Sequence, residues 1–189
     1  MTVATPVALP EPDPPLGDAE IVLRPVTEDD EPAIAKACQE PEIARWTPIS
    51  APYSEANAAK YVGNCRRRWR KRKGAAFAIL DAITGEFLGV VDVRMRDYPR
   101  ASVGAWLKRE ARSRGIALRA LRYISRWALT EAGIVRLAFL TDPQNEAARR
   151  LAEKAGFTRE GVLRAFVEVD GRRRDRVVFS LLPEDLGLS

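Results

Sequence analysis

The 189-residue sequence predicts an α/β domain in which a mixed, mainly antiparallel central sheet is flanked by helices. Strand-like and helical segments alternate in the order βα(α)βββαβαββ, which is typical of this class. Three consecutive strand-like segments are joined by turn-like connections, and the sequence contains no internal repeat. Apolar residues make up 46% of the chain, which is enough for the core of one domain of this length.

The N-terminal segment differs in composition from the rest of the chain. Five prolines lie between residues 6 and 15, so we expect residues 1–18 to form a disordered tail and residues 19–186 to form the folded domain. A basic stretch followed by an apolar one is missing, so the segment is not predicted to be a secretory signal. Residues 19–26 are predicted as the first strand, and Thr27 with the acidic residues at 28–30 suits the start of the helix that follows.

The middle of the chain predicts a second helix and an antiparallel meander. Residues 54–74 carry apolar side chains at helical spacing, with Ser54 as the expected N-cap and Gly74 as the stop. Strands are predicted at 75–81, 86–95 and 101–108. The connections AITG and RDYP between these strands are typical of turns, so the strands are expected to pair antiparallel.

The last third of the chain predicts helices that alternate with strands. A helix is expected to begin near Gly115 and to end before Gly133, because its apolar residues recur at helical spacing. A turn at Asp170-Gly171 is predicted between the final two strands. The other predicted elements are a strand at 134–141, a helix at 145–156, and strands at 163–171 and 175–182.

Composition excludes several kinds of chemistry. The chain has no histidine, which rules out histidine-based metal sites and Ser-His or Cys-His catalysis, and no metal site is expected. Its two cysteines, Cys38 and Cys65, are too few for a disulfide framework, so a cytoplasmic location is expected. Since no apolar run approaches the length of a bilayer span, no membrane contact is expected.

The loop RSRGIA at residues 112–117 stands directly before a predicted helix. Glycine allows a close approach of the backbone, and the first N–H groups of a helix have no partner, so such a loop suits the two phosphates of a diphosphate. Arg112 and Arg114 would then add charge-assisted hydrogen bonds. Taken alone, the stretch favours the simpler interpretation, a polar loop that only caps an amphipathic helix, because short motifs match by chance.

Several motifs in the same order and spacing resemble the GNAT acyl-CoA N-acyltransferase superfamily, and in particular its RimJ/RimL-like branch. The motifs are residues 40–48, 103–124, 141–164 and 170–182, and the resemblance extends from Ile21 to Leu182. It implies the GNAT fold, in which the strands at 101–108 and 134–141 splay apart. The implied activity is direct transfer of an acetyl group from acetyl-CoA to a primary amine, on a protein N-terminus or a small molecule.

The resemblance also implies a cofactor site for coenzyme A. The family signature R-x-x-G-x-G/A is met by Arg112, Gly115 and Ala117. The backbone amides expected to bind the diphosphate belong to Arg112, Ser113, Arg114, Gly115, Ile116 and Ala117. The strand residues Ala105, Trp106 and Leu107 would pair with the pantetheine arm through main-chain hydrogen bonds. Asn145 would contact this arm, cap the next helix, or do both.

Two carboxylates are the candidate catalytic bases, because acyl transfer requires a neutral amine. Asp92 alternates with Val91 and Val93 along a strand, so it faces either the acceptor cleft or solvent. Glu168 lies in a late strand and is the second candidate, whereas Glu160 is expected on a turn.

The oxygen and the leaving group of the thioester also need partners. Backbone N–H groups at Trp106 and Leu107 would polarise the thioester carbonyl, which gives Leu107 a catalytic role. Where the family commonly supplies a tyrosine or serine as general acid, this chain has Ala148 and Ala152. Either solvent provides the proton for the thiolate, or the acyl donor differs. Cys38 and Cys65 lie outside these motifs, which argues against a covalent thiol intermediate.

The acceptor side is the least defined part of the sequence. Residues 45–57 would form one wall of the acceptor site, where Trp46 and Tyr53 either line the site or pack against the core. The acceptor itself, and the choice between monomer and homodimer, do not follow from the sequence.

A basic tract offers an alternative function. The net charge is +5, and the tract RRRWRKRK at 66–73 carries seven positive charges, mostly on the outer face of the predicted helix. A solvated helix face is one interpretation. The alternative hypothesis is a GNAT-fold protein that contacts tRNA or ribosomal RNA through Arg66, Arg67, Arg70 and Lys71 and transfers an aminoacyl group. A coenzyme A-binding regulator without turnover is a third hypothesis.

Overall fold

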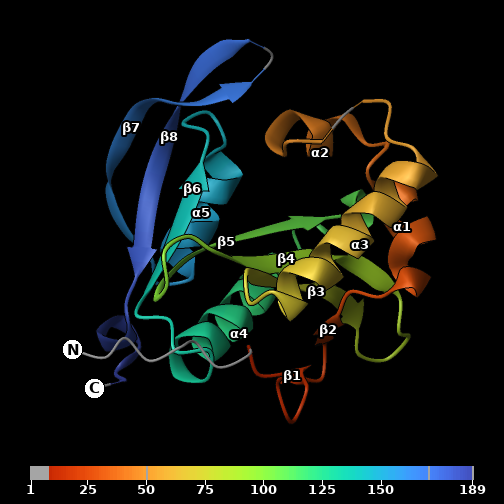
Figure 1. Cartoon of the computed structure of the whole chain (residues 1–189), viewed down its shortest axis with the longest axis horizontal. Coiled ribbons are helices and arrows are strands. Elements are labelled where there is room, and N and C mark those ends of the chain that lie inside the picture. The colour runs from red at the N-terminus through yellow and green to blue at the C-terminus, as the bar shows by residue number, and fades with distance from the viewer. Residues whose placement is uncertain (1–8, 50, 170, 189) are drawn as a thin grey trace.

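The computed structural model describes residues 9–49, 51–169 and 171–188. The strands in these ranges form one eight-stranded sheet in the order β1-β2-β3-β4-β5-β6-β8-β7 (Figure 1). They span Leu16–Gly17 (β1), Ile21–Pro25 (β2), Gly74–Asp81 (β3), Phe87–Met95 (β4), Arg100–Leu107 (β5), Arg136–Thr141 (β6), Thr158–Val169 (β7) and Arg172–Leu181 (β8). The predicted α/β class with a mixed, mostly antiparallel sheet is confirmed.

Helices cover both faces of the sheet. Alternate side chains of a strand point to opposite faces, and apolar side chains on each face pack against helices. Ala76 and Ala78 of β3 pack with α1 to α3, whereas Phe77 packs with α4 and α5. None of the helices in the described part of the chain has the length and hydropathy of a membrane span. The helices are α1 (Glu31–Ala37), α2 (Pro41–Trp46), α3 (Glu55–Arg70), α4 (Ile116–Thr130) and α5 (Glu146–Lys154), with 3-10 turns η1 (Glu28–Asp30), η2 (Arg109–Ala111) and η3 (Pro183–Leu186).

The central strands β5 and β6 diverge, as the family resemblance implies. These two strands are parallel and pair only where Arg100–Ser102 lies beside residues 136–138. Beyond that point, β5 continues to Leu107 and β6 to Thr141 without further pairing between them (Figure 1). The predicted meander of β3, β4 and β5 is confirmed as antiparallel. An open slot therefore lies between the outer halves of β5 and β6.

The last hairpin is longer than the sequence predicts. The expected strands at 163–171 and 175–182 become β7 and β8, and β7 begins at Thr158. Register shifts between Arg159 and Gly161, and between Leu163 and Val167, interrupt the alternation that signals a strand. Residue 170 of the predicted turn lies outside the described residues.

Glu160 is a strand residue of β7 and not a turn residue. Its carboxylate accepts hydrogen bonds from both terminal nitrogens of Arg136, at 2.8 and 2.5 Å, and from Ser180 Oγ at 2.8 Å. The hydrogen bonds from Arg136 lower the pKa of Glu160, although partial burial opposes them. Glu160 is therefore a structural ion-pair partner that ties β7 to β6.

Part of the predicted N-terminal tail belongs to the folded domain. Leu9 is buried in the core, and β1 pairs antiparallel with β2. The Asp18 carboxylate accepts hydrogen bonds from Arg119, at 2.8 Å, and from the Tyr123 hydroxyl, at 3.3 Å. The expected tail at 1–18 is thus corrected for residues 9–18, because these long-range contacts leave no signal in a proline-rich composition. Residues 1–8 lie outside the described part of the chain.

Candidate functional site

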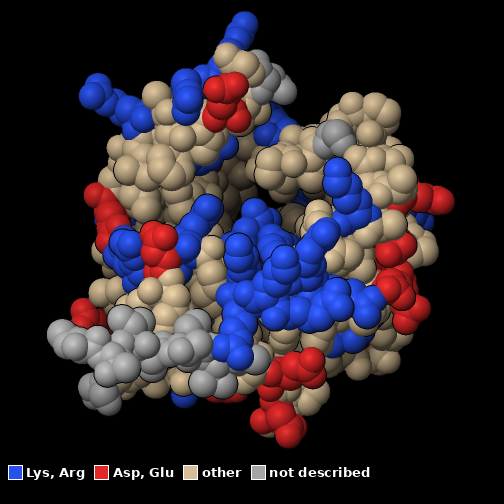
Figure 2. All heavy atoms as spheres, viewed as in Figure 1, with Lys and Arg blue, Asp and Glu red and all other residues tan. Residues whose placement is uncertain are grey.

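A cavity of about 1230 Å³ joins the split sheet to the surface. Its walls come from the diverging parts of β5 and β6, from α2, from the C-terminal half of α3, and from the first turns of α4 and α5. Figure 2 shows a dark hollow in this face of the molecule, bordered by a broad group of Lys and Arg side chains. The cavity brings together the predicted cofactor loop, the predicted base Asp92 and part of the basic tract.

The loop before α4 presents a set of free backbone donors. No N–H group of residues 113–118 donates a hydrogen bond to any residue in the described ranges. Gly115 has φ +77° and begins α4 without a side-chain cap, and Ser113 has φ +61°, which is uncommon for a residue with a side chain. Backbone N–H groups that converge at a helix N-terminus form an anion-binding site. The geometry therefore fits a diphosphate.

The two arginines of this loop have acidic partners within the protein. The Arg112 guanidinium forms two hydrogen bonds of 2.7 Å with the Glu40 carboxylate and also donates to the Leu107 carbonyl. The Arg114 guanidinium is 4.0 Å from Asp81, is more than half exposed, and does not line the cavity. Arg112 therefore fixes the loop to the segment between α1 and α2 while it lines the cavity, whereas Arg114 lies outside the cavity.

The free edge of β5 is defined by the alternation of its hydrogen bonds. The Lys108 N–H donates to the Leu88 carbonyl, so the N–H and C=O groups of Trp106, two residues earlier, also point toward β4. The backbone groups of Ala105 and Leu107 then point into the slot. The Leu107 carbonyl is taken by Arg112, which leaves its N–H as the free donor. The predicted contribution of the Trp106 N–H is thus corrected, although Trp106 is among the residues that line the cavity.

Asp92 lies in the cavity and not on a solvent-facing strand surface. It is 6% exposed, and its Oδ2 is 2.7 Å from Arg94 Nε and 3.8 Å from an Arg68 terminal nitrogen. Its Oδ1 lies above Gly104, 3.7 Å from where a Cβ of that residue would stand. Two guanidinium groups thus compensate the negative charge of Asp92 at Oδ2. The other carboxylate oxygen, Oδ1, lies on the side of β5.

Two other predicted site residues lie outside the cavity. The Glu168 side chain is 61% exposed on the β7–β8 hairpin, with Arg173 Nε at 3.7 Å, so it is corrected to a surface residue. Tyr53 is buried among the side chains of α1 and α3, which leaves it a packing role. Trp46 lines the cavity as predicted, and the Arg45 guanidinium stacks 4.5 Å from its ring centroid.

The helix α5 contributes apolar and capping groups to the cavity, together with the basic residues Arg150 and Lys154. The Asn145 side chain accepts a hydrogen bond from the Ala148 N–H at 3.0 Å, so it is an N-cap, and it also lines the cavity. Ala148 lines the cavity as well, whereas Ala152 is fully buried. Neither alanine donates a proton.

The cysteines are also unsuited to nucleophilic catalysis. Cys38 and Cys65 are both buried, and burial raises the pKa of Cys38 to about 11. Burial also raises the pKa of Cys65, although Arg68 opposes this effect. Thiolate formation is therefore unfavourable at both residues near neutral pH.

Tyr61 is a cavity residue that sequence reasoning assigned only to the apolar stripe of the second helix. It lines the cavity from α3, close to Cys65 and Asp92. Burial raises the pKa of Tyr61 well above its usual value, and the neighbouring Cys65 and Asp92 raise it further. Tyr61 is therefore a protonated phenol near neutral pH, and its side chain is hydrogen-bonded to Cys65. The feature of the sequence that could have identified Tyr61 as a cavity residue is its position one helical turn before Cys65, on the same face of the helix.

The basic tract is divided by the structure. Arg67 and Lys71 line the cavity, whereas Arg66 and Arg70 do not. Arg66 forms an ion pair with Glu28 on the outer surface. Trp69, the aromatic residue within the tract, packs at 5.1 Å from Phe77 and 6.4 Å from Trp127, measured between ring centroids. The tract is therefore neither a uniform solvated face nor a uniform binding surface.

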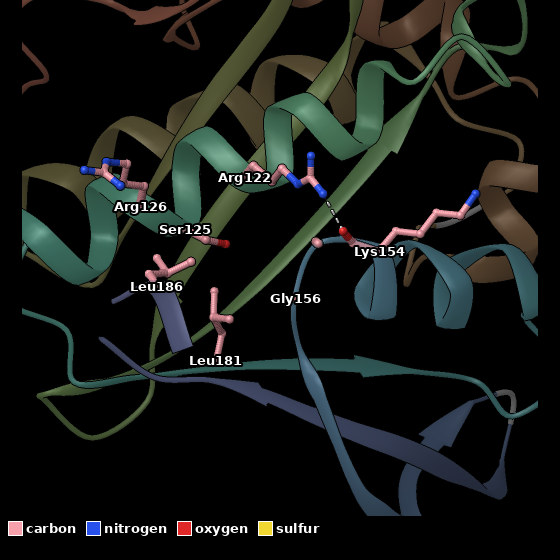
Figure 3. Close-up of a pocket in the computed structure, with 8 residues that line it drawn as sticks. Arg122, Ser125, Arg126, Lys154, Gly156, Leu181 and Leu186 are labelled. Carbon is pink, nitrogen blue, oxygen red and sulfur yellow. Dashed lines mark hydrogen bonds between the residues drawn. The ribbon is translucent and has the colours of Figure 1, made fainter. Parts of the chain in front are cut away.

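A second cavity of about 330 Å³ lies between α4, the turn after α5 and η3. Figure 3 shows the Ser125 hydroxyl directed from α4 into this space, while the Arg122 guanidinium donates to the Lys154 carbonyl at 2.7 Å. Ser125 is 2% exposed, and its Oγ has no hydrogen-bond partner among the described residues. An unpaired buried hydroxyl of this kind destabilises a fold.

Ser125→Ala is expected to raise the free energy of unfolding by about 1 kcal/mol, because it removes the unpaired hydroxyl and improves helix propensity. Urea denaturation with an unchanged m-value measures this difference. Ser180→Ala is the matched control, since Ser180 is also buried but donates to Glu160 at 2.8 Å, and it is expected to lose about 1 kcal/mol. A Ser125→Ala protein that is less stable than the parent contradicts the prediction.

Comparison with known proteins identifies relatives of the whole domain. A family profile described as acetyltransferase (GNAT) domain matches residues 20–158. The chain is 25% identical over 164 residues to the uncharacterized N-acetyltransferase YoaA of Bacillus subtilis, covering 86% of this chain and 93% of that protein. Mycobacterium smegmatis RimJ in complex with CoA-disulfide has a TM-score of 0.80 and 24% identity, covering 88% of this chain and 83% of that chain. RimL, a ribosomal α-N-protein acetyltransferase in complex with coenzyme A, has a TM-score of 0.78 and 18% identity, covering 87% and 95%.

Proposed function

The chain belongs to the acetyltransferase (GNAT) domain family, and we propose that it transfers an acetyl group from acetyl-CoA to a protein N-terminal amine by direct attack. The observation that carries this proposal is one continuous cavity that joins the free N–H groups of residues 113–118 to the open edge of β5. The structural likeness to RimJ and RimL, of which RimL is named as acting on a protein α-amine, supports this choice of acceptor.

The residues present fit coenzyme A. The loop at 113–118 offers unpaired donors for two phosphates, and a side chain at Gly115 would meet no protein atom within 4 Å, so the space in front of the loop is open. The Ala105 backbone offers an N–H and a C=O to an extended chain laid along β5. Acetyl-CoA supplies an acetyl group activated as a thioester.

Each remaining chemical task has a residue in the cavity. The Leu107 N–H faces the slot and is placed to donate to a developing oxyanion. Asp92, through Oδ1, is the carboxylate best placed to accept the proton of an attacking amine, because Glu168 is remote and the Glu42 carboxylate is engaged by Arg45 and Trp46. A thiolate is a good leaving group, so solvent suffices as its proton source.

A panel of peptides and small amines incubated with acetyl-CoA tests the proposal, with free thiol release as the measurement. Peptides with a free N-terminus are expected to release thiol, and the same peptides with a blocked N-terminus are expected to be inert. Asp92→Asn is expected to lower kcat about 100-fold, because general-base catalysis contributes at least that factor. The rate of this variant is expected to rise more steeply toward alkaline pH than the rate of the parent enzyme. Coenzyme A binding without turnover of any amine contradicts the proposed enzyme and favours a regulator.

A further inference from the structure

We infer that the acceptor carries an acidic peptide segment directly after its reactive amine, and that cations at the inner end of the cavity bind this segment. The inference rests on the proposed function and specifies its substrate class. Nine Lys and Arg side chains but only two acidic ones line the cavity in the described part of the chain. Six of these cations come from the end of α3 with the turn after it, and from the end of β4 with the residue after it: Arg67, Arg68, Lys71, Lys73, Arg94 and Arg96.

Two of these cations, Arg94 and Arg96, are placed far from the loop that suits a diphosphate. Arg94 lies opposite Ser102 in the β4–β5 register, and Arg96 Nε donates to Ser102 Oγ at 3.2 Å. Ser102 is the last β5 residue that pairs with β6, so this is the closed end of the slot. Five strand residues, or about 17 Å, separate Ser102 from Leu107, after which the loop begins. These two cations therefore border the acceptor half of the cavity.

Most of this positive charge has no acidic partner within the protein. Asp92 is shared by Arg94 and Arg68, and Glu42 is engaged by Arg45 and Trp46. Among the described residues, no ion pair neutralises Arg67, Lys71, Lys73 or Arg96. A concave site lined by one sign of charge attracts ligands of the opposite sign. Carboxylates close to the amine would supply the missing partners.

A peptide fits this site better than a nucleic acid does. Single-stranded nucleic acids are commonly held by aromatic side chains on which the bases stack. The aromatic residue within the basic tract, Trp69, packs against Phe77 and Trp127 and is not one of the residues that line the cavity. Arg66 and Arg70 do not line the cavity, so the tract does not form a continuous track for a phosphate backbone within it. The segment from α2 onward adds the apolar residues Ile43, Pro48 and Ile49 to the lining, which suits the start of a polypeptide.

Two peptides with the same first residue test the inference: Ser-Glu-Asp-Glu and Ser-Gln-Asn-Gln, each extended by the same neutral tail. The acidic peptide is expected to have a kcat/KM at least about tenfold higher, mainly through KM, since two charge-assisted contacts account for this factor. The preference is expected to shrink at high salt. Binding of the labelled peptides without acetyl-CoA, followed by fluorescence anisotropy, is expected to show the same order.

Two double variants that remove equal charge from one helix provide the matched comparison. Arg67→Gln with Lys71→Gln is expected to abolish the preference for the acidic peptide. Arg66→Gln with Arg70→Gln, outside the cavity, is expected to leave it within about twofold. Filter binding of tRNA to the parent protein and to the same two double variants tests the alternative that the cations bind a nucleic acid.

The outcomes separate this inference from the proposed function. Equal kcat/KM and equal binding for both peptides overturn the inference and leave the acetyltransferase proposal intact. If neither peptide is acetylated, the proposed function fails, and the anisotropy comparison still decides the charge preference. Equal effects of the two double variants overturn the inference, because the attraction would then belong to the whole helix. Tight tRNA binding that is lost with Arg67 and Lys71 overturns it in favour of RNA.

Discussion

Gly115→Val is expected to weaken coenzyme A binding by at least about 100-fold. A side chain at this residue meets no protein atom within 4 Å, so it does not disturb the core but stands in the space that the phosphates require. It also strains a backbone with φ +77° and turns the free N–H groups of the loop away from their common focus. The loss of two hydrogen bonds to charged oxygens, at about 1.5 kcal/mol each, accounts for this factor.

Gly85→Val is the matched control for this experiment. Gly85 lies in the turn between β3 and β4 with φ +72°, has no atom within 4 Å of its virtual Cβ, and does not line the cavity. Both variants should lose about 1–2 kcal/mol of stability through backbone strain. Calorimetric titration with coenzyme A should detect a loss of affinity only for Gly115→Val, and unchanged affinity in that variant would contradict the diphosphate site.

Local patterns in the sequence predicted the scaffold of the site correctly. Alternation along β4 placed Asp92 opposite to Val91 and Val93, and in the structure those valines enter one core while Asp92 enters the cavity. The junction at Gly115 was detectable because a helix start, a glycine and a preceding strand are all encoded within a few residues. Such features depend on neighbours in the chain, which a single sequence contains.

Side-chain roles that depend on distant partners were not predictable in the same way. Arg112 is bound by Glu40, 72 residues earlier, and nothing near either residue in the sequence indicates this pair. Tyr53 and Glu168 have the residue types of a site, but only the packing of α3 and the path of the β7–β8 hairpin decide that one is buried and the other exposed. The basic tract was visible by composition, whereas the division between Arg67 and Arg66 required the orientation of α3.

Gly89→Ala is expected to impair catalysis although the residue does not line the cavity. Gly89 lies opposite Leu107 in the β4–β5 register. A Cβ at Gly89 would overlap the Trp106 carbonyl oxygen and come within 2.8 Å of Leu107 Cα. Both are backbone atoms of β5, so the clash can be relieved only by a shift of this strand. The Leu107 N–H, the donor proposed for the thioester oxygen, would move with the strand. A displacement of about 1 Å at such a group lowers kcat by about 100-fold.

A loss of activity alone would not distinguish displacement of β5 from general destabilisation, so Gly17→Ala serves as the control. A Cβ at Gly17 would overlap the Ile21 carbonyl oxygen in the same manner, but between β1 and β2 at the far edge of the sheet. Both variants are expected to lose about 1–3 kcal/mol of stability from overpacking. Only Gly89→Ala should lower kcat/KM when both are assayed well below their melting temperatures. If Gly89→Ala retained parental kcat and coenzyme A affinity, the placement of the Leu107 N–H would not matter for the reaction, and the role assigned to the β5 edge would be wrong.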